Sequence, residues 1–266
     1  MNALHAWLVL RGQSFSERLN GWVQVFRFAV TAIAGMISPL TYNKATRLIV
    51  QKQIYFTGWQ ILPGFTLFAA LFSGLIIEIV SSTAGRYGLY EYALELIVRI
   101  LVLEILPLMT ALFIALRTGA AINTEVALMK IQNELVALQR IGIDPVRLEL
   151  LPRVLGGTVS VLALTAVNIV VALWLTYLLI IDFHPWSLTP GDYTRVVGRV
   201  LDLPALAVLW LKIVAFGFAV TVIPIAEGLN TPQKLFHAPI SVLRGMVRLF
   251  FSLMIIEATA IAIVYV

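Results

Sequence analysis

The chain has 266 residues, of which 60% are hydrophobic and 12% are charged, and its formal net charge is +5. Soluble domains are about half apolar and a quarter charged, so this composition excludes an ordinary water-soluble fold and favours a membrane protein. The absence of cysteine excludes disulfides, thiolate metal sites and thiol nucleophiles. The three histidines, His5, His184 and His237, lack metal-ligand spacing, so we expect no metal site. Basic residues form no dense block, so we expect no nucleic-acid partner.

The N-terminal region, residues 1–58, is expected to lie at the membrane surface. Its longest apolar run, residues 28–37, is shorter than the roughly 20 residues that a span requires. Nearby arginines and Trp22 favour an interfacial helix, and a buried helix of a soluble fold is the alternative. The first apolar stretch is short and is followed by Arg11 and Arg18, which is not the pattern of a cleaved signal peptide. We therefore expect the N-terminus to be retained.

Five longer apolar segments fit the thickness of a bilayer. The predicted spans cover about 59–81, 94–116, 152–181, 203–224 and 246–266. No internal repeat, low-complexity tract or long linker divides them, so residues 59–266 are expected to form one membrane domain. The predicted fold is an all-α polytopic membrane protein, with an N-terminal interfacial helix, five transmembrane helices and a cytoplasmic helix between the second and third.

Lysine and arginine set the predicted orientation, because positive loop residues resist translocation. They concentrate in the N-terminal region, between the second and third spans and before the fifth span. Examples in these three segments are Arg27, Lys44, Arg47 and Lys52, then Arg117, Lys130, Arg140 and Arg147, and finally Lys234 and Arg244. The prediction is a cytoplasmic N-terminus and an extracytoplasmic C-terminus.

Residues 123–141, between the second and third predicted spans, have the signals of a short helix. Asn123 or Thr124 is expected to cap its start, and Gly142 and Pro145 are expected to end it. At 100° per residue, one apolar stripe collects Leu128, Ile131, Leu135 and Leu138. The stripe packs either on the protein's own spans and the lipid interface or on a partner, and periodicity alone leaves both open.

Several motifs together resemble one known family. They are Glu104-Ile105-Leu106-Pro107, Arg117-Thr118-Gly119-Ala120, Gly142-Ile143-Asp144-Pro145, Pro152-Arg153 and, earlier, Lys52-Gln53-Ile54-Tyr55-Phe56-Thr57-Gly58. These residues and the five-span layout are similar to the MlaE/YrbE permeases over roughly residues 45–266. The sequence departs from that family at Leu106, Leu116 and Ala127, where the family usually has glycine, and in the loop 227–240, which lacks its glycine-rich pattern. The departures bear on close helix approach and on substrate identity.

The resemblance implies an ABC permease of the bacterial inner membrane that acts as a homodimer. It implies ATPase subunits on the cytoplasmic side, MCE-domain proteins on the other side, and phospholipid or a related lipid as substrate. Residues 123–141 would be the coupling helix, and the implied coupling residues are Arg117, Glu125, Leu128, Met129, Ile131, Leu135, Leu138, Asp144 and Pro145. The chain lacks a Gly-x-x-x-x-Gly-Lys-Ser/Thr loop, so we expect no enzyme activity or cofactor of its own, with ATP and Mg²⁺ on the partner.

Four charged residues stand out among those within predicted spans, where a charge is costly unless it faces protein, water or substrate. They are Glu78, Glu104, Lys212 and Glu257. One hypothesis is a lipid pathway, with Glu104 beside a kink at Pro107 and Lys212 available to a lipid phosphate. The other is a structural ion pair between Lys212 and Glu104 or Glu257. A proton-coupled secondary carrier that uses these carboxylates is the alternative function.

Overall fold

A computed structural model describes residues 21–38, 44–182, 188–234, 236 and 238–265, and every regular element in those ranges is helical. Five helical stretches are long and apolar enough to cross a membrane. They are Thr46–Gly85, Tyr90–Ile131, Val146–Ile181, Leu203–Asn230 and Ala238–Val264. The prediction of an all-α polytopic membrane protein with five spans is confirmed. The three histidines lie outside the described residues.

The first three stretches contain several elements each, because π-helical turns interrupt the α-helices. The first stretch contains α2 (Lys44–Ile54), η2 (Tyr55–Trp59) and α3 (Leu62–Gly85). The second contains α4 (Tyr90–Leu96), η3 (Ile97–Ile105), α5 (Leu106–Ile114), η4 (Ala115–Gly119) and α6 (Ala120–Ile131). The third contains η5 (Val146–Leu150), α8 (Leu151–Tyr177) and η6 (Leu178–Asp182). The last two are single helices, α10 (Leu203–Asn230) and α11 (Ala238–Tyr265).

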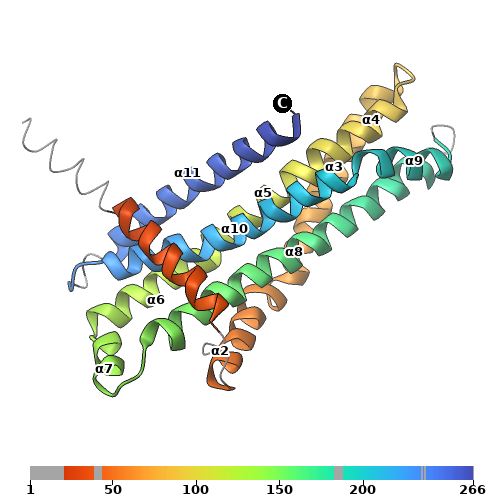
Figure 1. Cartoon of the computed structure of the whole chain (residues 1–266). Helices are drawn as coiled ribbons and strands as arrows, with labels where there is room; N and C mark the ends of the chain where they lie inside the picture. Colours follow the sequence, from red (N-terminus) through yellow and green to blue (C-terminus); the bar gives the residue numbers. More distant parts are fainter. Residues whose placement is uncertain (1–20, 39–43, 183–187, 235, 237, 266) are drawn as a thin grey trace, which may run out of the picture.

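Two short helices lie between the stretches, at opposite ends of the elongated bundle (Figure 1). Helix α7 (Glu134–Arg140) lies at one end with α2 and α6, which we call the α7 end. Helix α9 (Pro190–Val200) lies at the other end with α4, which we call the α9 end. Thr189 caps α9 reciprocally with Asp192, which fixes where that helix begins.

Helix α10 lies at the centre, where it packs against α6, α8 and α11 (Figure 1). Most of its residues from Phe216 onward are buried. Gly217 permits close approach to α8, because a Cβ at that position would lie only 2.9 Å from the Cα of Thr158. Two of the residues that replace family glycines, Leu106 and Ala127, are fully buried within the packing, whereas Leu116 is 70% exposed.

The apolar N-terminal helix, Gly21–Ile37, is too short to be among the five candidate spans. It begins earlier than the predicted run 28–37, because residues 21–27 continue the same helix. Its inward face is anchored at both ends. Gly21 lies against Arg248 of α11, and Gly35 lies against Leu151 of α8. The helix therefore crosses the bundle instead of running beside the spans (Figure 1).

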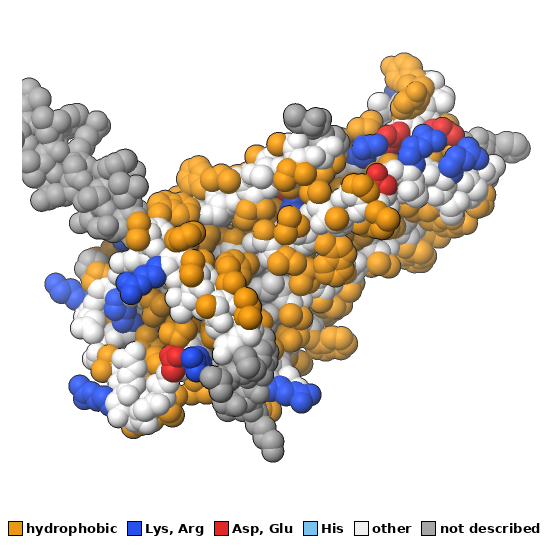
Figure 2. All heavy atoms as spheres, viewed as in Figure 1, with side chains coloured by type: hydrophobic (Ala, Val, Ile, Leu, Met, Phe, Trp, Pro, Cys, Tyr) orange, Lys and Arg blue, Asp and Glu red, His pale blue; other side chains and the backbone are white. Residues whose placement is uncertain are grey.

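The surface has the distribution expected of a membrane protein. Figure 2 shows hydrophobic side chains across the middle of this face and most charged side chains toward its two ends. Exposed apolar residues continue along the spans, for example Leu71 and Leu75 of α3 and Val247 and Phe251 of α11. Together with the five long apolar helices, this distribution identifies a multi-pass membrane protein.

The predicted single helix over 123–141 is wrong. Helix α6 continues directly from the second span and ends at Ile131, and α7 begins only after Asn133, which adopts a left-handed conformation (φ 60°). That one residue changes the direction of the chain, so the stripe was drawn across two helices. Asn123 and Thr124 lie inside α6 and cap nothing: the Thr124 hydroxyl donates to the Ala120 carbonyl within the helix.

The predicted end of this segment is confirmed. Gly142 is left-handed (φ 81°), its N–H donates to the Gln139 carbonyl, and the N–H of Ile143 donates to the Leu138 carbonyl. This pair of bonds is the usual glycine termination of a helix. Pro145 follows directly before η5.

Candidate functional site

The first candidate site begins with a defect in the second span. Pro107 lies in the first turn of α5 and has no N–H, so it offers nothing to the carbonyl four residues earlier, that of Leu103. The preceding residues relax into the π-helical segment η3. Such segments are rare inside α-helices and are frequent at functional sites. The carbonyl of Leu103, a buried residue next to Glu104, is thus left without its α-helical donor.

Lys212 of α10 fills that position. Its Nζ is 2.7 Å from the Leu103 carbonyl oxygen and also donates to Glu104. The same ammonium lies 3.3 Å from Glu257 Oε2 of α11. Lys212 is only 4% exposed and Glu257 only 7%. Three spans therefore join at one buried ammonium, and two carboxylates share a single positive charge.

The structure thus contains the ion pairs that the sequence offered as one alternative, and Lys212 takes part in both. The cavity beside Leu103, Glu104 and Lys212 is about 10 Å³, room for about one water molecule. A lipid headgroup does not fit there within one chain. Glu78 is exposed on α3 and belongs to none of the ion pairs among the described residues. It is not brought together with Glu104, Lys212 and Glu257.

The second candidate site is the α7 end. No residue of α7 is buried, and Leu128, Met129, Ile131, Leu135 and Leu138 are all half-buried. The chain therefore covers the predicted stripe in part. In α7 and the turn that follows it, the large apolar residues most open to solvent are Val136 and Ile141, at 41% and 70%. Sequence reasoning did not select them, because they fall outside a stripe computed for one continuous helix.

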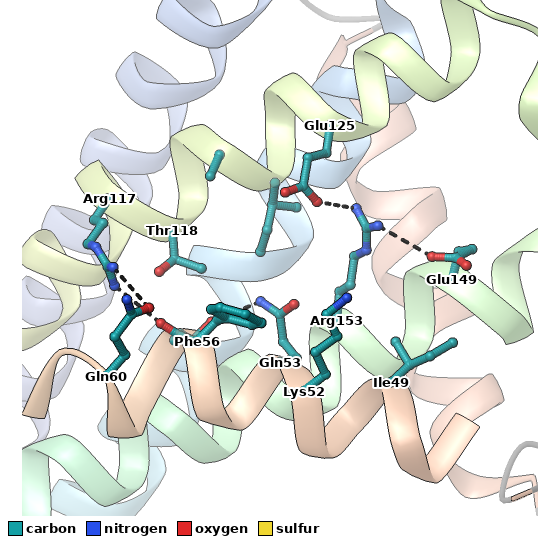
Figure 3. Close-up of a pocket in the computed structure, with 13 residues that line it drawn as sticks. Ile49, Lys52, Gln53, Phe56, Gln60, Arg117, Thr118, Glu125, Glu149 and Arg153 are labelled. Carbon is teal, nitrogen blue, oxygen red and sulfur yellow. Dashed lines mark hydrogen bonds and ion pairs between the residues drawn. The ribbon is translucent and has the colours of Figure 1, made fainter. Parts of the chain in front are cut away.

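Charged groups tie the α7 end to the third stretch. Arg153 of α8 lies 2.9 Å from Glu125 of α6 and 3.3 Å from Glu149 of η5 (Figure 3). Asp144 accepts from the N–H of Val146 and lies 3.4 Å from the Arg147 guanidinium, which shapes the turn into η5. Pro145 in that turn is buried. Glu125 and Asp144 are thus engaged with the chain's own arginines.

Arg117, the remaining predicted coupling residue, belongs to a different part of this end. It lies in η4 and donates to the Phe56 carbonyl at 3.2 Å and to Gln60 at 3.5 Å (Figure 3). These contacts join the first and second stretches. Arg117 therefore points toward η2 and does not extend the apolar surface of α7.

Sequence reasoning missed a buried polar network beside α6. Arg248 of α11 pairs with Glu227 of α10, and its guanidinium lies 5.9 Å from the ring centre of Trp22 in the N-terminal helix. Ser241 donates to Asn123 of α6 at 3.2 Å. A signal for this network was available, because Arg248 is a charge inside the predicted fifth span.

Comparison with known proteins identifies the family. The family described as Permease MlaE matches residues 50–263, which is most of the chain. The chain belongs to the MlaE permease family. The resemblance seen in the sequence is confirmed.

Two relatives of this permease show how far the similarity extends. The intermembrane phospholipid transport system permease protein MlaE of Haemophilus influenzae is 29% identical over 213 residues, 73% of this chain and 78% of that protein. A probable ABC transporter permease protein of Rickettsia typhi is 25% identical over 202 residues, 76% of this chain and 75% of that one. The matches cover most of each protein, and they indicate a transporter component.

Proposed function

We propose that this permease is the membrane subunit of an ABC transporter that moves phospholipid or a related lipid. The observation that carries the proposal is the family match over residues 50–263. The names of the relatives support it, since one is a phospholipid transport permease and another a probable ABC transporter permease. By the same analogy the protein resides in a bacterial inner membrane, as a homodimer, and exchanges lipid with an MCE-domain protein.

ATP would be hydrolysed by a separate subunit, which would also hold the ATP and Mg²⁺. The sequence has no phosphate-binding loop of the Gly-x-x-x-x-Gly-Lys-Ser/Thr type. We infer that the ATPase docks at the α7 end, where Val136 and Ile141 present apolar surface on a short helix. The concentration of Lys and Arg at this end supports a cytoplasmic position for it by the positive-inside rule.

Docking is tested by purification of the complex from its native host. Leu135→Asp and Ile141→Asp should each release the ATPase subunit, because each places a charge on the apolar contact surface. Gln139→Asp is the matched control, since it adds the same charge at an exposed polar position of α7 and should retain the ATPase. If Leu135→Asp and Ile141→Asp both retain the ATPase, the docking surface lies elsewhere.

The lipid would pass beside the buried charges of the second, fourth and fifth spans. Because the cavity there holds about one water molecule, we propose that the pathway forms between two copies of the chain or opens during the transport cycle. Glu78, on the exposed side of α3, would then line the outer part of the pathway. If Glu104→Gln and Lys212→Met leave lipid transfer by the reconstituted complex unchanged, this assignment is wrong.

A proton-coupled carrier remains the second candidate. The observation that favours it is the imbalance at Lys212, where two carboxylates share one ammonium. A carrier of this kind would move substrate in liposomes that contain only this chain and a pH gradient, without nucleotide. An ABC permease would not.

A further inference from the structure

A second, larger pocket lies apart from the buried ion pairs. It measures about 500 Å³ and opens at the α7 end between the first three helical stretches (Figure 3). Its walls come from α2 and η2 on one side, η4 and α6 on another, and η5 and α8 on the third. Its volume is within the range of small-molecule sites, about 300–1,000 Å³.

Aromatic residues indicate the depth of this pocket in the membrane. Tyr55 and Trp59 of η2 are 53% and 69% exposed. Exposed tyrosine and tryptophan collect at the level of the lipid headgroups. Phe56 and Gln60, which belong to the same turns, line the pocket. The mouth of the pocket is therefore at headgroup level.

The charges around the pocket do not balance. Three cations line it, Lys52, Arg117 and Arg153, against two carboxylates, Glu125 and Glu149. Both carboxylates lie within 3.3 Å of the Arg153 guanidinium. The lining cations without a carboxylate partner among the described residues are thus Lys52 and Arg117.

Lys52 and Arg117 are both available to a ligand. Lys52 is exposed, points into the pocket, and forms none of the ion pairs among the described residues (Figure 3). Arg117 is held in place by the Phe56 carbonyl and Gln60, which use only part of its set of five N–H donors. Thr118 adds a hydroxyl to the lining. The lining thus offers one guanidinium held in place, one ammonium and one hydroxyl, and neither cation has a paired carboxylate among the described residues.

We propose that this pocket binds the phosphate of a lipid headgroup from the leaflet at the α7 end, with preference for anionic lipids. Basic pockets between transmembrane helices bind anionic headgroups in this way. Ile49 and Phe56 supply apolar walls for the part of the lipid next to the phosphate, which a free phosphate ion would leave empty. The site does not depend on which lipid the protein transports, or on whether it transports one.

The test uses the full chain in nanodiscs of phosphatidylcholine that contain increasing fractions of phosphatidylglycerol, with bound phosphatidylglycerol counted by native mass spectrometry. Lys52→Gln and Arg117→Gln should each lower the apparent affinity about fivefold. Lys52→Arg should retain it. Arg147→Gln is the matched control: it removes an exposed positive charge at the same end, from a residue outside the pocket that pairs with Asp144.

Each outcome decides the proposal. Loss of affinity in Lys52→Gln with retention in Arg147→Gln supports it. Equal loss in both variants would mean general attraction to a charged surface and would overturn it, as would unchanged affinity in Lys52→Gln. Displacement of the bound lipid by millimolar inorganic phosphate would show that the site takes free phosphate and would overturn the lipid assignment. Lys52→Gln decides the test, because Lys52 is exposed and its replacement should not disturb the fold. A lower affinity in Arg117→Gln counts only if Lys52→Gln also shows one, since Arg117 holds the first and second stretches together.

Discussion

The ammonium of Lys212 donates to the carbonyl of Leu103, a backbone group in the second span that has lost its usual partner. A charged side chain of one span thus completes the hydrogen bonding of another. The arrangement explains how a lysine, two glutamates and a proline coexist at the centre of an apolar bundle. It also predicts which substitutions should be costly and which should compensate one another.

Removal of Lys212 alone should be strongly destabilising. Lys212→Met leaves the buried Glu257 and the half-buried Glu104 without their cation, and breaking a buried pair costs about 3–5 kcal/mol. Thermal unfolding in detergent should show this loss, and adding Glu104→Gln and Glu257→Gln to Lys212→Met should recover most of it. A triple variant that is no more stable than Lys212→Met would contradict the ion-pair account.

Pro107 and Lys212 should be energetically coupled. Pro107→Ala supplies an N–H that can bond to the Leu103 carbonyl. That carbonyl then no longer depends on the Lys212 ammonium for its hydrogen bond. Lys212→Met should then cost about 1.5–3 kcal/mol less than in the parent, the value of one hydrogen bond from a charged donor. The control is Pro190→Ala, in the first turn of α9 directly after the extended residue Thr189, where an N–H has no helical partner; its effect should simply add to that of Lys212→Met. If the stability losses of Pro107→Ala and Lys212→Met also simply add, the two residues are not coupled.

The turn after α7 should depend on Gly142. Gly142→Ala forces a side chain into the left-handed region at a cost of about 1 kcal/mol, which should speed hydrogen exchange of the α7 amides about fivefold. Gly64→Ala is the matched control, since Gly64 is helical and a Cβ there meets no atom within 4 Å. Unchanged exchange in Gly142→Ala would show that the turn is not held by its glycine.

The α9 end should respond to acid through Asp192. Hydrogen bonds from the Thr189 side chain and backbone lower the pKa of Asp192 below its ordinary value of 3.8. Because the folded pKa is depressed, the carboxylate stabilises the start of α9 fully above about pH 4, and that contribution is lost as the pH falls through the folded pKa. Hydrogen exchange of the α9 amides, corrected for intrinsic rates, should therefore rise on acidification in the parent. An equal rise in Asp192→Asn would exclude this carboxylate as the cause.

The features that could be predicted from the sequence are those that follow from composition or from single residue types. The spans and the intramembrane charges Glu104, Lys212 and Glu257 were visible because charges interrupt long apolar runs. The sequence left open whether Lys212 pairs with Glu104 or with Glu257. It did not predict the contact of Lys212 with the Leu103 carbonyl, because a backbone group has no side-chain signature. Pro107, four residues later, was the one available sign of it.

Features that depend on local geometry or on distant parts of the chain were not predictable in the same way. The apolar stripe over 123–141 was wrong because left-handed Asn133 separates two helices, which an unbroken 100° periodicity cannot represent. The first, second and fourth helical stretches extend past the predicted span ends at 81, 116 and 224, because apolar content does not mark where a helix stops. Helix α6, for example, is polar in part and packs against α10 and α11. The pocket at Lys52 and Arg117 needed three stretches to be brought together.

The most direct test of the central claim is lipid transfer by the complex purified from its native host and reconstituted in liposomes. With ATP and Mg²⁺, labelled phospholipid should move, and movement should stop when the ATPase subunit is released by Ile141→Asp. Movement that needs no nucleotide, or that follows a pH gradient when this chain is present alone, would contradict the account and favour a secondary carrier.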